Sequence, residues 1–421
     1  MSFVFSNAQS REVLKIKGFL WFLSGRFSLT IALQMTFVIV GWQVYEITKD
    51  PLALGLIGLS EALAFFSVAL FAGYIADSFK RKKIILVITL LLILEGITLF
   101  LLSYRFFDTL KTNGIFPIYI IMFMIGASRG FIYPAVIALM GQLVPRNLYA
   151  TSSAWNSLVW HIAAVTGPAI GGLVYGFFNA NIAYITCVIF ALFGLIFFLN
   201  VPDLAKPVKE VKESLRQSIL SGVKFVFKSQ HLLGTMSLDM FAVLFGGVTA
   251  LLPVFAAEIL DAGPKGLGLL RAAPAIGSVA MSLYLTTRPP ADKAGKKLFF
   301  SIACFGLCII CFALSSNFYL SVAILIISGM ADNMSVVIRN TVLQLYTPDN
   351  MRGRVAAVNS VFIGSSNEIG AFESGLAAKV MGLVPSVIFG GSMTLFVVGV
   401  IARLSPALRK LNLKNDIVVI K

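Results

Sequence analysis

The sequence predicts an all-α membrane protein with twelve transmembrane helices, arranged as two pseudo-symmetric six-helix halves. The first observation is composition: 58% of the 421 residues are hydrophobic and only 13% are charged, with a mean hydropathy of +0.90. A soluble domain of this size needs more polar surface. The second is a series of apolar runs, and the third is an internal repeat.

The apolar runs are each about the 20 residues that a spanning helix needs. Proline and glycine separate them, as in Asp50-Pro51, Gly263-Pro264 and Pro289-Pro290. The first run is too long for a signal peptide and has no cleavage site after it, so we expect it to be the first span. The predicted spans are 18–46, 52–77, 82–104, 116–143, 151–177, 182–200, 233–259, 264–287, 296–315, 318–345, 354–380 and 385–404.

Lysine and arginine predict the orientation. Alternate connections are rich in basic residues, whereas the connections between them hold few, such as Lys49, Lys265 and Lys379. The positive-inside rule therefore predicts that both termini are cytoplasmic. The basic connections include Lys80 to Lys83, Arg146, Lys206 to Lys228, Arg288 to Lys297, and Arg352 to Arg354.

A long basic connection lies between the predicted halves. We expect an N-terminal half at 1–200, a cytoplasmic linker at 201–232 and a C-terminal half at 233–421. Within the linker, Leu215, Ile219, Val223 and Val226 recur at helical spacing. The segment is either an amphipathic helix on the inner leaflet or a plain linker.

The repeat relates the two halves in the same orientation. PLALGLI at 51–57 matches PKGLGLL at 264–270, an offset of 213 residues. Ala154, Asn156 and Ser157 match Ala357, Asn359 and Ser360 at an offset of 203, and a longer loop in the first half explains the difference. Parallel repeats of this kind are typical of one large class of transporters, with the substrate site between the halves.

The sequence resembles the major facilitator superfamily over nearly its whole length. GYIADSFKRKK at 73–83 is similar to the motif of its loop between helices 2 and 3, through Gly73, Asp77, Arg81 and Lys82. It departs from the motif at Ser78 and Lys80, and the second half lacks the acid. The resemblance implies that Asp77 and Arg81 latch the cytoplasmic gate near the start of helix 11, where the helix dipole favours a carboxylate.

A second motif and several further stretches narrow the resemblance. TGPAIGG in the fifth predicted span, with Gly167, Pro168, Gly171 and Gly172, is similar to the helix motif of antiporter-type exporters. Glycine permits close helix packing, and proline favours a kink. LDMFAVLFGG, LGLLRAAPAIG and TPDNMRGRVAAVNS resemble the third drug:proton antiporter branch, which includes enterobactin-exporter-like proteins.

Charged residues within the spans are candidate functional residues, because each costs about 2.5–3.5 kcal/mol at mid-membrane. At the two repeat offsets, Arg26 aligns with Asp239 and Arg129 with Asp332. Since helices 1, 4, 7 and 10 line the cavity of the resembled fold, we expect a basic wall and an acidic wall. No role is assigned to Glu61 and Glu95.

The acids are candidates for proton coupling. Burial favours a protonated carboxyl and a nearby arginine favours a carboxylate, so a change of partner loads and unloads a proton. Asp239 and Asp332 come first and Glu373 third. The alternative is that Asp332 with Arg339, or Asp239 with Arg26, forms a static ion pair. Arg26, Arg129 and Arg339 are candidate substrate-binding residues, because arginine binds anions and phenols well.

The predicted function is proton-coupled efflux of an amphiphilic small molecule, such as a drug or siderophore, by a monomer in a bacterial inner membrane. Import or lipid flipping on the same fold is the alternative. We expect neither an enzyme nor a nucleic-acid-binding protein, and no cofactor. The sequence has no phosphate-binding GxxxxGK[ST] loop. Cys304, Cys308 and Cys311 lie in one apolar run and are expected to be small buried hydrophobic residues, because a metal site needs more ligands, and the two histidines are too few and too separated.

Overall fold

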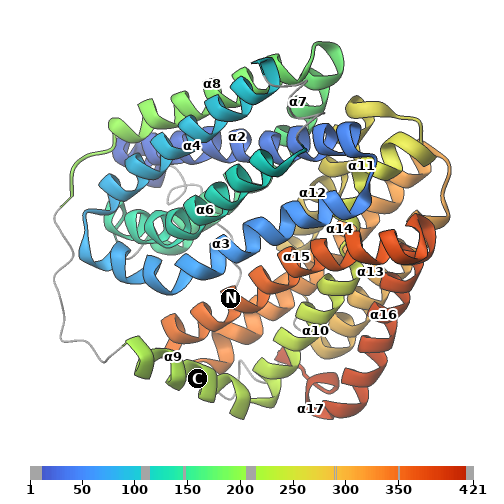
Figure 1. The fold of residues 1–421 in the computed structure, drawn as a ribbon. Helices are drawn as coiled ribbons and strands as arrows, with labels where there is room; N and C mark the ends of the chain where they lie inside the picture. Colours follow the sequence, from blue (N-terminus) through green and yellow to red (C-terminus); the bar gives the residue numbers. More distant parts are fainter. Residues whose placement is uncertain are drawn as a thin grey trace. The chain divides into compact units, whose positions relative to one another are not determined.

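A computed structural model describes residues 12–105, 114–145, 148–204, 215–288, 290, 292–348 and 351–413. Regular structure in these residues is helical throughout, which confirms the predicted all-α class (Figure 1). The α-helices are α2 (Lys17–Thr48), α3 (Pro51–Ser78), α4 (Arg81–Arg105), α6 (Phe116–Leu143), α7 (Tyr149–Phe177), α8 (Ala180–Leu199), α9 (Leu215–Lys228), α10 (Gln230–Gly246), α11 (Leu252–Val254), α12 (Gly263–Thr287), α13 (Ala294–Leu314), α14 (Phe318–Tyr346), α15 (Arg352–Met381), α16 (Leu383–Leu404) and α17 (Pro406–Arg409).

Eleven segments within the described residues are long and apolar enough to cross a membrane. They confirm that the chain is a multi-pass membrane protein. The remaining long helix, α15, has 30 residues but is more polar, with Asn359, Asn367, Glu368 and Glu373 along it. The twelfth span and the orientation of the termini stay predictions.

The predicted span 233–259 is not one continuous α-helix. The α-helix α10 ends at Gly246, and the chain continues as a 3-10 turn η2 (Val248–Leu251), the short α11 and a π-helical turn η3 (Phe255–Ile259). Two causes lie in the sequence: the Gly246-Gly247 pair disfavours helix, and Pro253 lacks a backbone donor. The predicted span agrees with the apolar segment Gln230–Ile259, but its second half is not regular α-helix.

The helices form two compact units, which are described separately. Unit 1 comprises 1–49, 59–210 and 261–272, and unit 2 comprises 50–58, 211–260 and 273–421. The first turns of α3 thus pack in unit 2, and the first turns of α12 pack in unit 1. The predicted boundaries at 200 and 232 do not describe this exchange of helix ends, and the division into halves stays a prediction.

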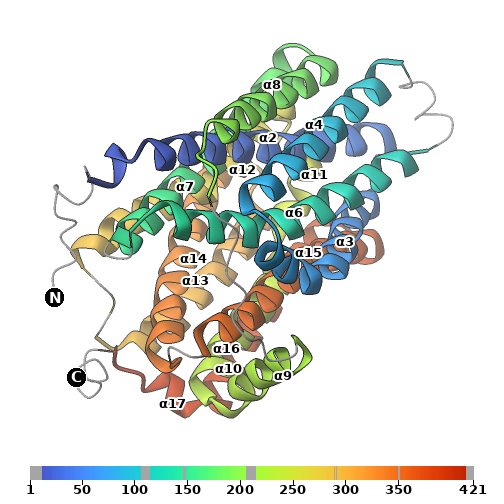
Figure 2. The same ribbon diagram turned by 90° about the vertical axis from the view of Figure 1, so that its left-hand side faces the viewer.

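Unit 1 is built around α2. This helix packs against α7 and α8, while α4 packs against α6 and α8. The four helices α2, α4, α6 and α8 lie side by side in both views (Figures 1 and 2). The interior is apolar, with Phe19, Phe22 and Phe198 fully buried. The side chains of α4 and α6 that face this interior are therefore shielded from water.

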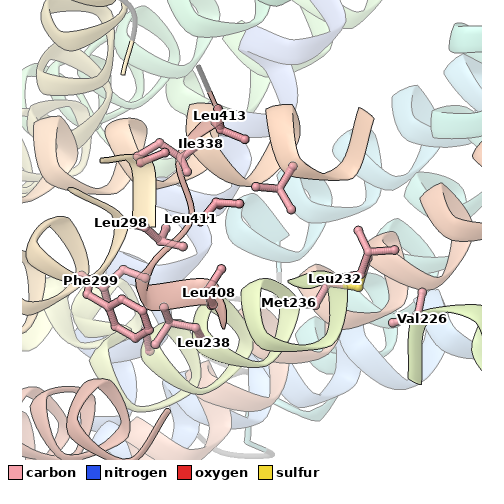
Figure 3. Close-up of a cluster of buried hydrophobic side chains, with 14 of the residues drawn as sticks. Val226, Leu232, Met236, Leu238, Leu298, Phe299, Ile338, Leu408, Leu411 and Leu413 are labelled. Carbon is pink, nitrogen blue, oxygen red and sulfur yellow. The ribbon is translucent and has the colours of Figure 1, made fainter. Parts of the chain in front are cut away.

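Unit 2 has a cluster of buried aliphatic side chains drawn from several helices (Figure 3). Leu238 of α10, Leu298 of α13 and Ile338 of α14 are fully buried in it. Leu408 of α17 and Leu411 also belong to the cluster, and the Leu411 carbonyl accepts a hydrogen bond from the Gly295 N–H at 3.0 Å.

The linker contains the helix α9, as its periodicity predicts. Val226 is fully buried, and Arg354 of α15 donates a hydrogen bond to Ser221 Oγ at 2.8 Å. Leu220 and Phe227 stay exposed, together with Lys224. One face of α9 is thus packed on unit 2, and its opposite face is apolar and basic.

Candidate functional site

In unit 2, two buried acids share one arginine. Arg339 of α14 forms an ion pair with Asp239 of α10, and both side chains are about one-tenth exposed. Asp332, two turns before Arg339 on α14, lies close enough to both groups to interact with their charges. Asp239 and Asp332 repel each other, and Arg339 attracts both. The three groups therefore carry one excess negative charge when both acids are ionised, and one proton removes it.

This pairing corrects the sequence-based alternatives. Those alternatives were static ion pairs of Arg339 with Asp332 or of Asp239 with Arg26. The ion pair that forms joins Arg339 to Asp239. The repeat could not predict it, because an offset relates equivalent positions in the two halves and says nothing of contacts within one half.

In unit 1, Arg129 of α6 forms an ion pair with Glu61 of α3. The Glu61 side chain is 5% exposed, whereas that of Arg129 is 35% exposed. Arg129 also lies over the Phe37 ring, with its guanidinium carbon 5.1 Å from the ring centroid. Glu61 is an intramembrane charge to which the sequence alone assigns no role. The expected basic wall is therefore neutralised in part at this position.

The helices of this pair approach closely. A Cβ added to Gly126 of α6 would lie 2.9 Å from the Glu61 Cα, so only glycine fits there. In unit 2, a Cβ on Gly329 of α14 would lie 2.6 Å from the Pro274 Cα of α12. Pro274 and Gly329 are related to Glu61 and Gly126 by the same two repeat offsets. In both units, a glycine at the equivalent position thus packs against the backbone of a neighbouring helix.

Arg26 of α2 belongs to unit 1 and is half-buried. Its Nε is buried and has no hydrogen-bond partner, and its charge interacts with the nearby Tyr133 of α6. Arg271 of α12 likewise has a buried Nε without such a partner. Glu373 of α15 is half-buried and next to Ser374, whose hydroxyl donates to the Gly247 carbonyl at 3.2 Å.

The motif at 73–83 is described only in part. The side chains of Gly73 and Asp77 lie outside the described residues, so their latch role stays a prediction. Arg81 donates to the Ala138 carbonyl at 3.1 Å. Lys82 donates to the Leu199 carbonyl at 3.0 Å and pairs with Asp203 at 3.3 Å. Both bases therefore hold unit 1 helices together at the end where α4 begins.

The glycines of the TGPAIGG motif face two different helices. Gly167 and Gly171 face α2, where an added Cβ would lie 2.7 Å from Gln34 Cβ or 3.1 Å from Met35 Cα. Gly172 faces α12, where its Cβ would lie 2.7 Å from the Gly268 Cα. Pro168 lies within α7, and its carbonyl also faces Gly268. The motif thus permits close packing on both sides of α7.

A second glycine pair has the same form. A Cβ on Gly375 of α15 would lie 2.8 Å from the Cα of Gly55 in α3, within unit 2. The repeat offsets relate Gly55 to Gly268 and Gly172 to Gly375. Each unit therefore holds one exchanged helix end through a glycine-to-glycine contact.

Comparison with known proteins places this geometry in a context. Residues 14–418 match the family model described as transmembrane secretion effector. The chain is 26% identical to the enterobactin exporter EntS of Shigella flexneri over 376 residues, which is 89% of this chain and 88% of that one. It is 25% identical, with the same coverage, to the enterobactin exporter EntS of Escherichia coli O1:K1 / APEC.

Two solved structures share the fold. A POT family transporter in complex with 5-aminolevulinic acid superimposes with a TM-score of 0.74 at 14% identity, covering 93% of this chain and 96% of the other. A bacterial homologue of the human lysosomal transporter Spinster, in an inward-facing and unoccupied conformation, gives a TM-score of 0.68 at 13% identity, covering 98% of both chains.

Proposed function

Because this chain belongs to the transmembrane secretion effector family of the major facilitator superfamily, and is a transporter and not an enzyme, we propose that it exports an amphiphilic small molecule by proton-coupled alternating access. The match over residues 14–418 carries the proposal, since it spans nearly the whole chain. The similarity to the enterobactin exporters supports the outward direction.

The shared arginine of unit 2 supports proton coupling. With Arg339 on Asp239, the second acid, Asp332, has no full countercharge of its own, and a proton on either acid balances the group. Movement of Arg339 between the acids would change which of them holds the proton. We assign the coupling proton to Asp332 and Asp239, with Glu373 as a further carboxyl on α15.

The topology that we propose has twelve spans: the eleven apolar segments and α15, which is the eleventh span in chain order. Its 30 residues exceed the length that a bilayer needs, and its polar residues suit a helix that faces protein and water more than lipid. The basic connections support cytoplasmic termini, and the bacterial relatives support a bacterial inner membrane. We expect the chain to work as a monomer.

The proposed substrate is a siderophore or a related metabolite with anionic or phenolic groups; the wider class of drugs is the alternative. Arg26 and Arg129 suit such groups, because a guanidinium donates two hydrogen bonds to one anion. The partial exposure of Arg129 leaves it open to a ligand, although Glu61 must then give up its partner.

The gate that we propose involves Asp77, with Arg81, as a latch on the cytoplasmic side. Asp77→Asn should lower turnover while substrate affinity and membrane insertion stay near the wild-type values. Lost affinity would argue that Asp77 binds substrate. We expect the TGPAIGG helix, which packs closely against Gly268, to have a role in setting the direction of transport.

Transport into everted membrane vesicles tests the whole proposal. Such vesicles accumulate an exported substrate in their lumen. A labelled siderophore should therefore enter them when the lumen is made more acidic than the surrounding buffer. Asp332→Asn should abolish the response to the gradient. Asp261→Asn is the matched control, because Asp261 is an exposed acid in the loop before α12.

Three outcomes would change the proposal. Full coupling in Asp332→Asn would remove that residue from the proton path. Accumulation in right-side-out vesicles only would favour import. Movement of labelled lipid in place of the siderophore would favour flipping. Metabolite profiles of medium from cells with and without the protein, at matched growth, would identify the exported compound.

A further inference from the structure

Glu95 is a buried acid whose partner is neutral. It lies on α4, is 4% exposed and faces α6, where Ser128 donates a hydrogen bond to its Oε1 at 3.0 Å. Its other oxygen, Oε2, is buried and has no hydrogen-bond partner. Within the described part of the chain, no cationic group pairs with Glu95.

The neighbouring position of α6 behaves differently. Arg129, directly after Ser128, forms its ion pair with Glu61 of α3. The helix therefore presents a hydroxyl to one acid and a guanidinium to the other. The only cation of α6 that is adjacent in sequence to Ser128 is thus engaged by a different carboxylate.

The remaining surroundings of Glu95 are also neutral. A small cavity is lined by Gly96, the residue after Glu95, together with Leu92 of α4, Leu33 and Thr36 of α2, and Cys187 of α8. Further along these helices, the Tyr184 hydroxyl donates to Gln43 at 2.6 Å, and Gln43 donates to Ser103 at 3.1 Å.

The charged groups of the packed helices lie elsewhere. On α2, the charged residue that is nearest in sequence to the cavity-lining Leu33 is Arg26, and its charge interacts with Tyr133. The titratable groups that α8 brings to this region are Cys187 and Tyr184, both neutral in their ordinary form. An ionised carboxylate without a cation costs several kcal/mol in such an apolar site.

Ser128 suits both protonation states of this acid. A serine hydroxyl donates to a carboxylate, and it accepts a hydrogen bond from a carboxylic acid. The same 3.0 Å contact therefore serves the loaded and the unloaded state with a rotation of the hydroxyl alone. Glu61 lacks this freedom, because a guanidinium only donates.

We propose that Glu95 and Ser128 form a proton-binding site in unit 1, distinct from the acids of unit 2. Glu95 holds a proton as a carboxylic acid in this conformation and releases it to water when α6 moves. Because Ser128 and Arg129 are consecutive, a displacement of α6 that alters the Arg129–Glu61 pair also shifts Ser128 against Glu95. The link to transport rests on the proposed proton-coupled export; the proton site itself does not.

Infrared difference spectroscopy of the purified full-length protein tests the site directly. A protonated carboxyl has a carbonyl band that a carboxylate lacks. Subtracting the Glu95→Gln spectrum from the wild-type spectrum should leave one such band, which shifts in heavy water and disappears as the pH is raised. Ser128→Ala should change the pH at which the band disappears, and Ser128→Thr should not.

Glu61→Gln is the matched control, because that acid is equally buried but paired with Arg129. Its difference spectrum should lack the band. A band that is absent for Glu95 at every pH, or present at every pH, would overturn the proposal, since the acid would then be permanently ionised or permanently neutral. A band that titrates in a protein without gradient-driven export would keep this site and remove the proposed function.

Discussion

Unit 1 and unit 2 both bury acids near an arginine, but they pair them differently. In unit 1, α6 gives each acid its own partner: Arg129 to Glu61 and Ser128 to Glu95. In unit 2, Asp239 and Asp332 share Arg339. Each arrangement leaves one carboxyl without a full countercharge. The comparison teaches that a transporter can hold a protonatable acid either by a neutral donor or by a divided ion pair.

The largest effect should come from Arg339→Gln, which leaves both acids of unit 2 without a cation. Removing one member of a buried ion pair costs about 3–5 kcal/mol. We expect a large fall in the melting temperature of the purified protein and the loss of export. The double variant Arg339→Gln with Asp239→Asn should recover much of the melting temperature. No recovery would mean that Arg339 stabilises unit 2 through contacts other than its charge.

A somewhat smaller effect is expected from Gly375→Ala in unit 2 or Gly172→Ala in unit 1. Each added methyl group would meet the opposite glycine at under 3 Å, and overpacking of this kind costs about 1–3 kcal/mol. Export and thermal stability should fall by similar amounts in both variants. Gly399→Ala is the control, because open space surrounds that position. A silent Gly375→Ala would show that the two glycine contacts are not equivalent.

Glu61→Gln should cost less than Arg339→Gln, at about 1 kcal/mol in unfolding free energy. Glu61→Gln leaves the charge of Arg129, which is 35% exposed and can be solvated, whereas Arg339→Gln leaves that of Asp239, which is only 10% exposed. Thermal unfolding of the two variants side by side checks the order. Equal losses would mean that the exposure of the remaining charge does not decide the cost.

The smallest effect belongs to Lys379→Gln. Lys379 pairs with Asp50 at 3.0 Å, but its side chain is 54% exposed, and surface ion pairs contribute about 0.2–1 kcal/mol. The melting temperature should change little, and added salt should remove the difference from wild type. A large loss that persists in high salt would show that this pair is shielded from solvent.

Hydrophobic runs and turn residues were enough to predict the helices. The run 116–143 has the bounds of α6, and most other spans are within a few residues of their helices. The break after Gly246 was missed because apolar composition is the same in an α-helix, a 3-10 turn and a π-helical turn. The Gly246-Gly247 pair and Pro253 were the available signals.

The charged pairs could not be predicted in the same way. Which acid meets which base depends on the rotation of each helix about its axis and on contacts between helices distant in sequence. Glu61 and Arg129 were both visible as intramembrane charges, yet nothing in the sequence joined α3 to α6 at those positions. The repeat offset of 203 does relate Gly172 to Gly375, and the glycine contacts of these two residues have the same form in both units.

The exchanged helix end at 50–58 has a consequence for biosynthesis. This segment is made early, directly after α2, yet it packs in unit 2, whose other segments begin at residue 211. Its glycine partner Gly375 is translated much later. Until then, the small-residue face of Gly55 and Gly58 lacks its native neighbours on α15. The start of α3 therefore enters the membrane before its partners in unit 2 have been made. Folding of unit 2 has to form a contact between Gly55, which is made early, and Gly375, which is made late.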